Sequence, residues 1–347
     1  MDPLADVLAL AQVRGTVAAT VYAGEAWGLN LAEVPGAAFH AITTGTVWLR
    51  LADRPPIHLM PGDVVLLPTG TAHAIASDPG QALEPFDHAA AEQAMATGGR
   101  LTVGAGPSHT RILCASYRHD PTVMVPLLGL LSTVVHVRPG ADGDALDGLV
   151  RLLAREINTP RAGASIVLDR LLDVVLVHIV RAWLDTSEAE DMPASWLRAL
   201  RDPVTAAALT ALHADPARGW TLDALAREAA TSRATLARRF PDLVGDTPAG
   251  YLTRWRMDLA AQRLRTTTDP IGPIARAVGY TSEYAFNRAF ARTTGQTPGR
   301  YRARHLGGRA KLPSQGPAEQ TPALVEEAEV GVVAEQVADV LPVGSHH

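Results

Sequence analysis

The chain has 347 residues, of which 47% are apolar and 19% charged, and its net charge is -5. This length predicts two compact domains, and the sequence has no uncharged apolar run of about 18 residues, which excludes membrane-spanning helices. The single cysteine, Cys114, excludes an internal disulfide framework and fits a reducing compartment. No secretory signal opens the chain, so we expect a cytoplasmic protein without a membrane partner.

The first third of the chain predicts β-structure. Residues 13–118 contain short β-rich runs separated by Gly and Pro turns, among them TVAATVY at 16–22, TVWLRL at 46–51, DVVLL at 63–67 and RILCASY at 111–117. Short strands at this spacing are typical of an antiparallel barrel or sandwich.

Two helices are predicted next, over 144–157 and 164–184, because the apolar residues there change to helical spacing. The second helix is apolar on most of its circumference, and its charged residues exclude a membrane span. We expect residues 165–184 to form a dimer contact, and packing on the chain's own barrel is the alternative. The acidic segment 185–195 is predicted to be an interdomain linker.

Charge is unevenly distributed along the chain. Residues 196–309 contain 18 arginines and 9 acidic residues, whereas the rest of the chain is net acidic. A basic segment of this kind indicates an anionic partner.

The basic segment contains an internal repeat, LAREAATSRATLARRF at 225–240 and IARAVGYTSEYAFNRAF at 274–290. In both copies a serine, Ser232 or Ser282, precedes an arginine by six residues and a phenylalanine by eight. Each copy predicts a short helix, a tight turn and a second helix capped by that serine, which is a helix-turn-helix. Gly279 suits the turn of the second copy, and Ala230 at the matching place carries a strain cost if its backbone is left-handed.

Polar side chains on the second helix of each copy are the candidates for DNA contact. Arginine can form a bidentate pair of hydrogen bonds with guanine, and asparagine can form one with adenine. A solvated charged face is the alternative, but its duplication within a basic segment favours DNA. The predicted DNA-binding residues are Arg233, Thr235, Arg238, Glu283, Tyr284, Asn287 and Arg288.

Between the copies, TPAGYLTRWRMDLAAQRLR predicts a long helix with Thr247 as its cap, suited to hold the two units apart. Residues 196–305 resemble the DNA-binding domain of the AraC/XylS family of bacterial transcription regulators. The resemblance implies two reader helices in successive major grooves of double-stranded DNA, with Ala234, Ala237 and Arg238 at base-facing positions of the first. The two alanines depart from the larger residues usual there, so Arg238 and the second reader helix are expected to contribute most of the discrimination between DNA bases.

The stretch GDVVLLPTGTAHAI at 62–75 has the spacing G-x5-P-x-G-x2-H, which resembles the second signature of the cupin barrel. In cupins its histidine, here His73, joins an H-x-H pair and a glutamate around a metal, whereas between Val34 and Trp48 this chain offers His40 alone and no carboxylate. Two imidazoles alone hold a metal weakly, so a metal-dependent enzyme is disfavoured and no cofactor is required. Zinc held by His40, His73 and Cys114 is the alternative, giving a metal- or redox-sensing regulator.

We therefore expect an α+β chain: a cupin-like β-barrel of the jelly-roll type with a two-helix dimerisation element over 1–184, a linker over 185–195, and an all-α double helix-turn-helix domain over 196–305. The tail 306–347 is predicted to be disordered, although four valines from Val330 to Val340 could form one helical stripe. The predicted function is that of a one-component transcription regulator rather than an enzyme fused to a DNA-binding module or an architectural DNA binder. Its expected partners are double-stranded DNA, a small-molecule effector, RNA polymerase and a second copy of the chain. The expected effector pocket consists of Trp27, Phe39, His40, Trp48 and His73.

Overall fold

The computed structural model describes residues 2–309 except 88, 92, 94–99, 119–126, 139–142, 160 and 188–191. The predicted tail beyond residue 309 and part of the predicted linker therefore lie outside the described residues. No helix in the described ranges is long and apolar enough to cross a membrane.

The first helix, α1 (Pro3–Leu10), begins at the cap Asp2, whose carboxylate accepts the Leu4 N–H at 2.9 Å. Proline at the first helical position and an acidic cap explain why a helix starts so close to the N-terminus. The strands that follow are β1 (Arg14–Glu25), β2 (Gly28–Leu31), β3 (Ala37–Thr44), β4 (Val47–Leu51), β5 (Arg54–Leu59), β6 (Val64–Leu67), β7 (His73–Ala76), β8 (Glu84–Pro85), β9 (Arg100–Val103), β10 (Ala105–Arg118) and β11 (Val135–Val137).

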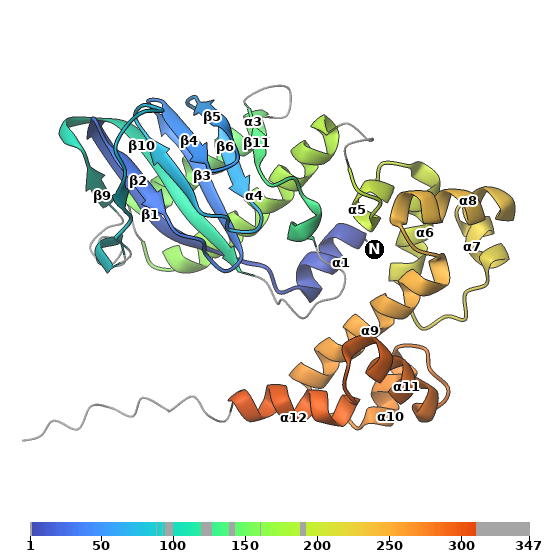
Figure 1. Ribbon diagram of the computed structural model, residues 1–347. Helices are drawn as coiled ribbons and strands as arrows, with labels where there is room; N and C mark the ends of the chain where they lie inside the picture. Colours follow the sequence, from blue (N-terminus) through green and yellow to red (C-terminus); the bar gives the residue numbers. More distant parts are fainter. Residues whose placement is uncertain are drawn as a thin grey trace, which may run out of the picture. The chain divides into compact units, whose positions relative to one another are not determined.

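These strands form two sheets, ordered β11-β6-β3-β10-β1-β9 and β5-β4-β7-β2-β8 (Figure 1). Most neighbours are antiparallel, and β9 and β8 pair parallel to β1 and β2. The predicted cupin-like β-fold is confirmed.

Alternation along β3 separates two apolar cores. Ala38 and Ile42 belong to the core between the two sheets, which we call the barrel interior. Ala37, Phe39 and Ala41 belong to a second core, which also contains residues of the helices. Successive side chains of a strand point to opposite faces, so one strand serves both cores.

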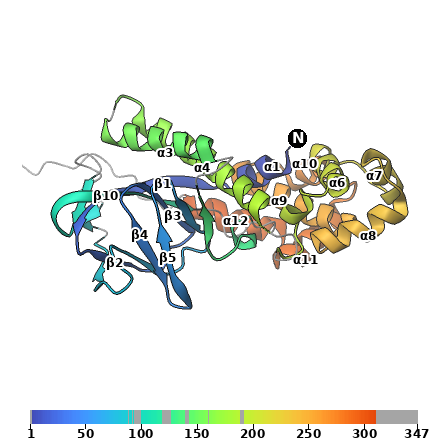
Figure 2. The same cartoon turned by 90° about the horizontal axis from the view of Figure 1, so that it is seen from above.

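The helices α3 (Gly143–Asn158) and α4 (Ala164–Thr186) confirm the predicted helix pair and lie side by side (Figure 2). α4 approaches β1 at Gly15, where an added Cβ would lie 2.5 Å from Leu172 Cβ. The buried Tyr117 hydroxyl on β10 donates to the Leu172 carbonyl at 2.9 Å. A glycine and a tyrosine on neighbouring strands thus fix the position of α4 over the sheet.

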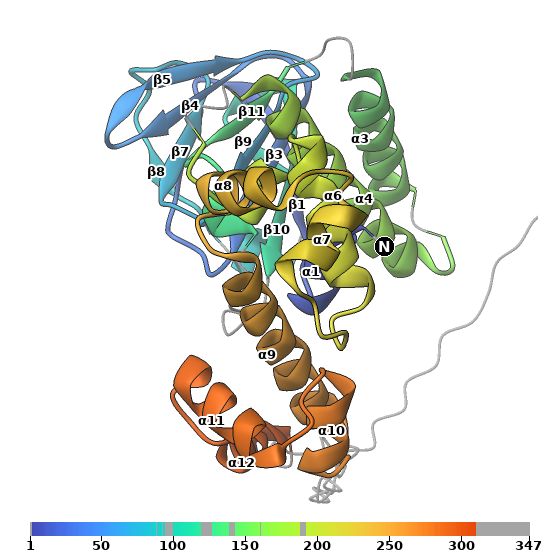
Figure 3. The same ribbon diagram turned by 90° about the vertical axis from the view of Figure 1, so that its right-hand side faces the viewer.

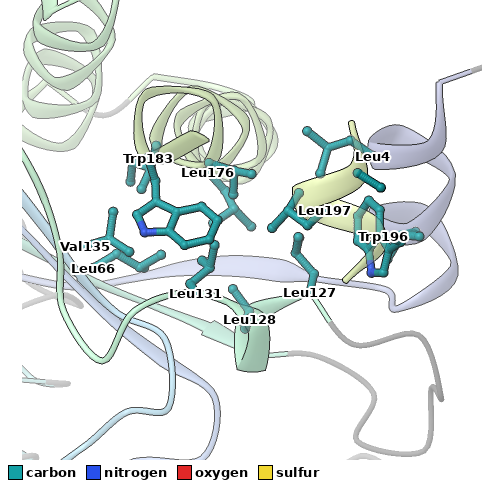
Figure 4. Packing of buried hydrophobic residues seen from close by; sticks show 14 of the residues in the cluster. Leu4, Leu66, Leu127, Leu128, Leu131, Val135, Leu176, Trp183, Trp196 and Leu197 are labelled. Carbon is teal, nitrogen blue, oxygen red and sulfur yellow. The ribbon is translucent and has the colours of Figure 1, made fainter. Parts of the chain in front are cut away.

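The second core continues from the sheet into the helices that precede and follow the barrel (Figure 4). It includes Leu4 of α1, Leu176 and Trp183 of α4, and Trp196 and Leu197 of the short helix α5 (Trp196–Ala199). The short helix η1 (Leu128–Leu130) contributes Leu128 to the same cluster. The barrel and the helical part of the chain therefore share buried apolar surface.

The helical part contains α6 (Pro203–Ala214), α7 (Leu222–Glu228), α8 (Arg233–Val244), α9 (Pro248–Thr266), α10 (Ile271–Ala277), α11 (Glu283–Thr294) and α12 (Pro298–Arg309). α9 runs between α8 at one end and the pair α10 and α11 at the other (Figure 3). A separate apolar core under α10 and α11 contains Phe286 and Phe290. The predicted double helix-turn-helix architecture, with α9 as its spacer, is confirmed.

Candidate functional site

Both helix-turn-helix units start their second helix in the same way. Ser232 accepts the Thr235 N–H at 3.1 Å at the start of α8, and Ser282 accepts the Ala285 N–H at 3.3 Å at the start of α11. Each helix also ends at a left-handed glycine, Gly245 or Gly295. The predicted serine caps are therefore present in both copies. We call α8 and α11 the reader helices.

The turn before each reader helix is left-handed. Gly279 has φ +88°, and Ala230 at the matching place of the first unit has φ +50°. Left-handed backbone suits glycine and strains an alanine. The expected strain cost at Ala230 is thus supported by its backbone conformation.

The exposed face of α11 carries most of the predicted DNA contacts. Tyr284 is 72% exposed, and the Arg288 guanidinium lies 5.8 Å from the centre of its ring. Glu283 is exposed as well, whereas Phe286 and Phe290 on the opposite side are fully buried. The helix therefore presents a polar, partly aromatic exposed face, and its opposite, apolar face is buried in the core.

The side chain of Asn287 is not placed for the expected bidentate contact with adenine. Its side chain is half-buried, and its Oδ1 is buried without a hydrogen-bond partner among the described residues. A bidentate contact with adenine needs both the amide oxygen and the amide nitrogen at the surface. In this conformation Asn287 cannot make that two-bond contact with adenine.

The exposed face of α8 carries fewer large side chains that could contact DNA than the exposed face of α11 does. Arg238 is exposed, as are the two alanines at 234 and 237. Arg233 pairs with Asp223 at 3.2 Å, both side chains being largely exposed, and the Thr235 hydroxyl lies 2.8 Å from the Ser232 hydroxyl. Arg238 is thus the long polar side chain of this helix that stands ready for a ligand, while Arg233 must first leave a weak surface ion pair.

Inside the barrel, the structure brings His40, His73 and Cys114 together as a chain of hydrogen bonds. His73 Nδ1 lies 2.8 Å from the Thr71 carbonyl, His73 Nε2 lies 2.8 Å from His40 Nε2, and His40 Nδ1 lies 3.2 Å from Cys114 Sγ. A carbonyl oxygen only accepts, so His73 carries its proton on Nδ1 and accepts at Nε2. His40 therefore donates from Nε2, and its Nδ1 accepts the thiol proton of Cys114.

Burial keeps all three groups of this chain neutral. It lowers the pKa of His40 well below the ordinary value, with a further lowering from neighbouring His73. It also lowers the pKa of His73, although the bond to the Thr71 carbonyl acts in the opposite direction, and it raises the pKa of Cys114 to about 12. Neutral, fully directed hydrogen bonds suit a polar anchor in an apolar pocket.

The same geometry bears on the zinc alternative. His40 uses one ring nitrogen toward Cys114 and the other toward His73, so its ring lies between the two other donors. A shared tetrahedral metal would require this ring to turn away from one of them. Within the described residues, no group of three or more His, Cys, Asp or Glu side chains is placed to hold a metal ion.

The aromatic members of the predicted pocket do not all face the histidines. Trp27 belongs to the barrel interior, as expected. Phe39 packs in the other core, 6.3 Å from Tyr117, because it neighbours His40 on the same strand and so points to the opposite face. Trp48 alternates with the buried interior residues of β4 and stacks on His58 at 4.5 Å. The prediction is therefore corrected: Phe39 and Trp48 do not lie on the side of the sheets that carries His40 and His73.

Sequence reasoning missed a polar cluster that involves α1. His213 of α6 lies between Asp6, at 3.2 Å from its Nδ1, and the Tyr251 hydroxyl, at 2.7 Å from its Nε2. Its ring also stacks on Trp255 of α9 at 4.1 Å. No local pattern signals this cluster, since 207 residues separate Asp6 from His213.

Comparison with known proteins agrees with this architecture. Residues 2–185 match a family described as cupin, and residues 225–304 match a helix-turn-helix domain family. The structure of the DNA-binding domain of AdpA in complex with a target DNA is 30% identical over 32% of this chain and 98% of that one, with a TM-score of 0.30.

Relatives match over most of their length. A putative AraC-like transcription regulator from Streptomyces antibioticus is 37% identical over 304 residues, covering 87% of this chain and 98% of the relative. The RCS-specific HTH-type transcriptional activator RclR from Escherichia coli is 29% identical, covering 88% of this chain and 98% of the relative. The chain therefore belongs to the AraC family of DNA-binding transcription regulators, with a cupin domain as its N-terminal part.

Proposed function

We propose that this regulator binds double-stranded DNA mainly through α11 and Arg238, and that a small molecule in the barrel interior changes that binding. The observation that carries the proposal is the duplicated reader helix, capped by serine in both copies and exposing arginine or tyrosine opposite a phenylalanine core. Helices of such units read base edges with their N-terminal residues. Arg288 then reads a base, and Tyr284 supports its guanidinium.

The proposed effector contacts His40 and His73. Their mutual hydrogen bond is a polar contact of the barrel interior that an effector oxygen or nitrogen can replace, while Trp27 and neighbouring apolar side chains contact its apolar part. No metal is required, because the neutral chain of hydrogen bonds is complete without one. We therefore propose a sensing role for the barrel, which is supported by relatives named as transcription regulators.

A homodimer is proposed through α4. One side of this helix is buried, including Leu172 and Ile179, while Ile166, Val167 and Val174 remain 67%, 41% and 42% exposed. Apolar side chains gathered on one helix are typical of a protein contact surface. The regulator would act on RNA polymerase at the promoter, in the bacterial cytoplasm.

The test uses the full chain and DNA from upstream of its own gene, with binding followed by fluorescence anisotropy. Affinity should fall steeply with salt, because arginines release counterions from phosphates. Arg288→Ala should cost about 1–3 kcal/mol on the preferred sequence and relax one base position.

Arg292→Ala, in the last turn of the same helix, is the matched control, since that turn lies farther from the N-terminal end that enters the groove. An equal loss for Arg288→Ala on every DNA sequence would assign this residue to phosphate. Affinity that is independent of salt would reject the interface altogether.

A further inference from the structure

The exposed side of the first reader helix, α8, differs from that of α11 at two matching positions. Counted from the capping serines, Ala234 of α8 corresponds to Tyr284 of α11, and Ala237 corresponds to Asn287. The arginine six residues after each serine is common to both helices. The first unit therefore has two methyl groups at the positions where the second has a phenol and an amide.

The other polar side chains on the first two turns of α8 have partners within the protein. Arg233 pairs with Asp223 at 3.2 Å, and Arg239 pairs at 2.9 Å with Asp202, the cap of α6. The Thr235 hydroxyl lies 2.8 Å from that of the capping serine. The side chains that remain for a ligand on these two turns are the two alanines and the arginine that follows them.

Helical geometry places these three side chains together. Ala234, Ala237 and Arg238 are all exposed, and residues three or four apart lie on one face of a helix. Arg238 forms no ion pair with the residues that the structure describes. From Ala234 to Arg238 the helix rises by about 6 Å, which matches about two base pairs of DNA. Both methyl groups therefore lie within about two base pairs of a base that Arg238 contacts.

The major groove offers one natural partner for a methyl group. Thymine carries a methyl group at C5, which alanine side chains contact, whereas arginine forms its bidentate contact with guanine. Exposed alanines alone would not identify a partner, because alanine also has the highest helix propensity. Here the alanines flank an arginine without an ion pair, near the N-terminal end of a helix whose unit belongs to a DNA-binding domain.

We infer that α8 reads thymine through the methyl groups of Ala234 and Ala237, next to a guanine bound by Arg238. The inference rests on the proposed function, in which Arg238 contacts the DNA bases. The two units then read DNA by different chemistry. The half-site under α8 depends on a thymine methyl group, and the half-site under α11 depends on polar contacts.

The test uses the full chain and the duplex that it selects from randomised DNA. 7-Deazaguanine lacks the N7 acceptor, so the guanine whose replacement weakens binding of the unsubstituted chain, but not of Arg238→Ala, lies under α8. A thymine should lie within about two base pairs of this guanine. Deoxyuridine in its place removes only the methyl group and should weaken binding about 3- to 5-fold, as expected for one apolar methyl group.

Glycine substitutions assign this preference to the alanines. Ala234→Gly and Ala237→Gly each remove one methyl group, and at least one of these variants should bind the thymine and deoxyuridine duplexes equally. Both duplexes are compared within one variant, so the cost of glycine to the helix cancels. Ala303→Gly changes an exposed alanine of α12 in the same way and is the matched control, which should keep the preference for thymine.

The outcomes separate this inference from the function on which it rests. Equal binding of both duplexes by the unsubstituted chain, no thymine near the identified guanine, or a preference for thymine that survives in both glycine variants of α8 would each overturn the inference and leave DNA binding intact. If no guanine responds differently in Arg238→Ala, the proposed base contact of Arg238 fails, and the inference fails with it.

Discussion

The two helix-turn-helix units differ at the left-handed residue of the turn, and exchanging these residues tests the strain argument. In Gly279→Ala the new Cβ would lie 2.6 Å from the Ala217 carbonyl oxygen and 2.8 Å from Ala217 Cα, both closer than real Cβ contacts. The left-handed conformation alone costs an alanine about 1–2 kcal/mol. Since the obstructing atoms are backbone, we expect a loss of about 2 kcal/mol or more in the free energy of unfolding.

The reverse change should be favourable. Ala230 already has φ +50°, so Ala230→Gly removes about 1–2 kcal/mol of strain. Glycine loses more backbone entropy on folding, which offsets about 0.5–1 kcal/mol of that gain. The expected net effect is a stabilisation of up to about 1.5 kcal/mol.

Urea unfolding of the full chain, followed by tryptophan fluorescence, measures both effects, and the transition of each variant is compared with that of the unsubstituted chain. DNA affinity is the second measurement, since the turn at Gly279 positions α11. Gly279→Ala should weaken DNA binding, and Ala230→Gly should preserve it. A destabilised Ala230→Gly variant, or a Gly279→Ala variant as stable as the unsubstituted chain, would refute the reasoning.

Three further predictions concern the barrel and α4. Burial holds the pKa of His40 and His73 below 6.5, so the unfolded chain binds more protons in acid than the folded chain does. The free energy of unfolding should therefore fall below about pH 6.5, by up to about 1.4 kcal/mol per pH unit for each histidine. Urea unfolding at several pH values should show a weaker pH dependence of this free energy in His73→Gln, and an unchanged pH dependence would contradict the prediction. The purified protein should contain no stoichiometric zinc by elemental analysis, and one equivalent that Cys114→Ser loses would establish the metal alternative. Val174→Glu should shift the protein toward monomer in light scattering while Asp169→Glu, a control on the same helix, does not, and an equal mass for both would return α4 to packing within its own chain.

The reader helices were predictable because their signals are local. Ser232 and Ser282, each followed by a phenylalanine at the same distance, specify a cap and a buried face within a dozen residues. A second repeated signal was available and went unused: each reader helix is followed by Gly-x-Thr-Pro, at 245–248 and 295–298, which ends one helix and starts the next. That signal predicts α12, which residues 298–309 form.

The pocket was predicted less well, for a reason of strand geometry. Phe39 and His40 are neighbours, and neighbours on a strand face opposite sides, so both could not line one pocket. The same alternation along β4 places Val47, Leu49 and Leu51 inside and Trp48 outside. Counting along β3 from His40 would have removed Phe39, and the apolar alternation of β4 would have placed Trp48 on the opposite face from Val47 and Leu49. The contacts of α1 could not be found this way, because they depend on packing between distant parts of the chain.

The contact between Asp6 and His213 also determines when the protein can finish folding during synthesis. At about 5–20 residues per second, α1 leaves the ribosome about 10–40 s before α6 does, because 207 residues separate the two partners. During that time the apolar side chains of Leu4, Val7 and Leu10 lack the helices they contact in the finished structure. The apolar side chains of α1 therefore stay without these partners until α6 and α9 of the DNA-binding half have been made.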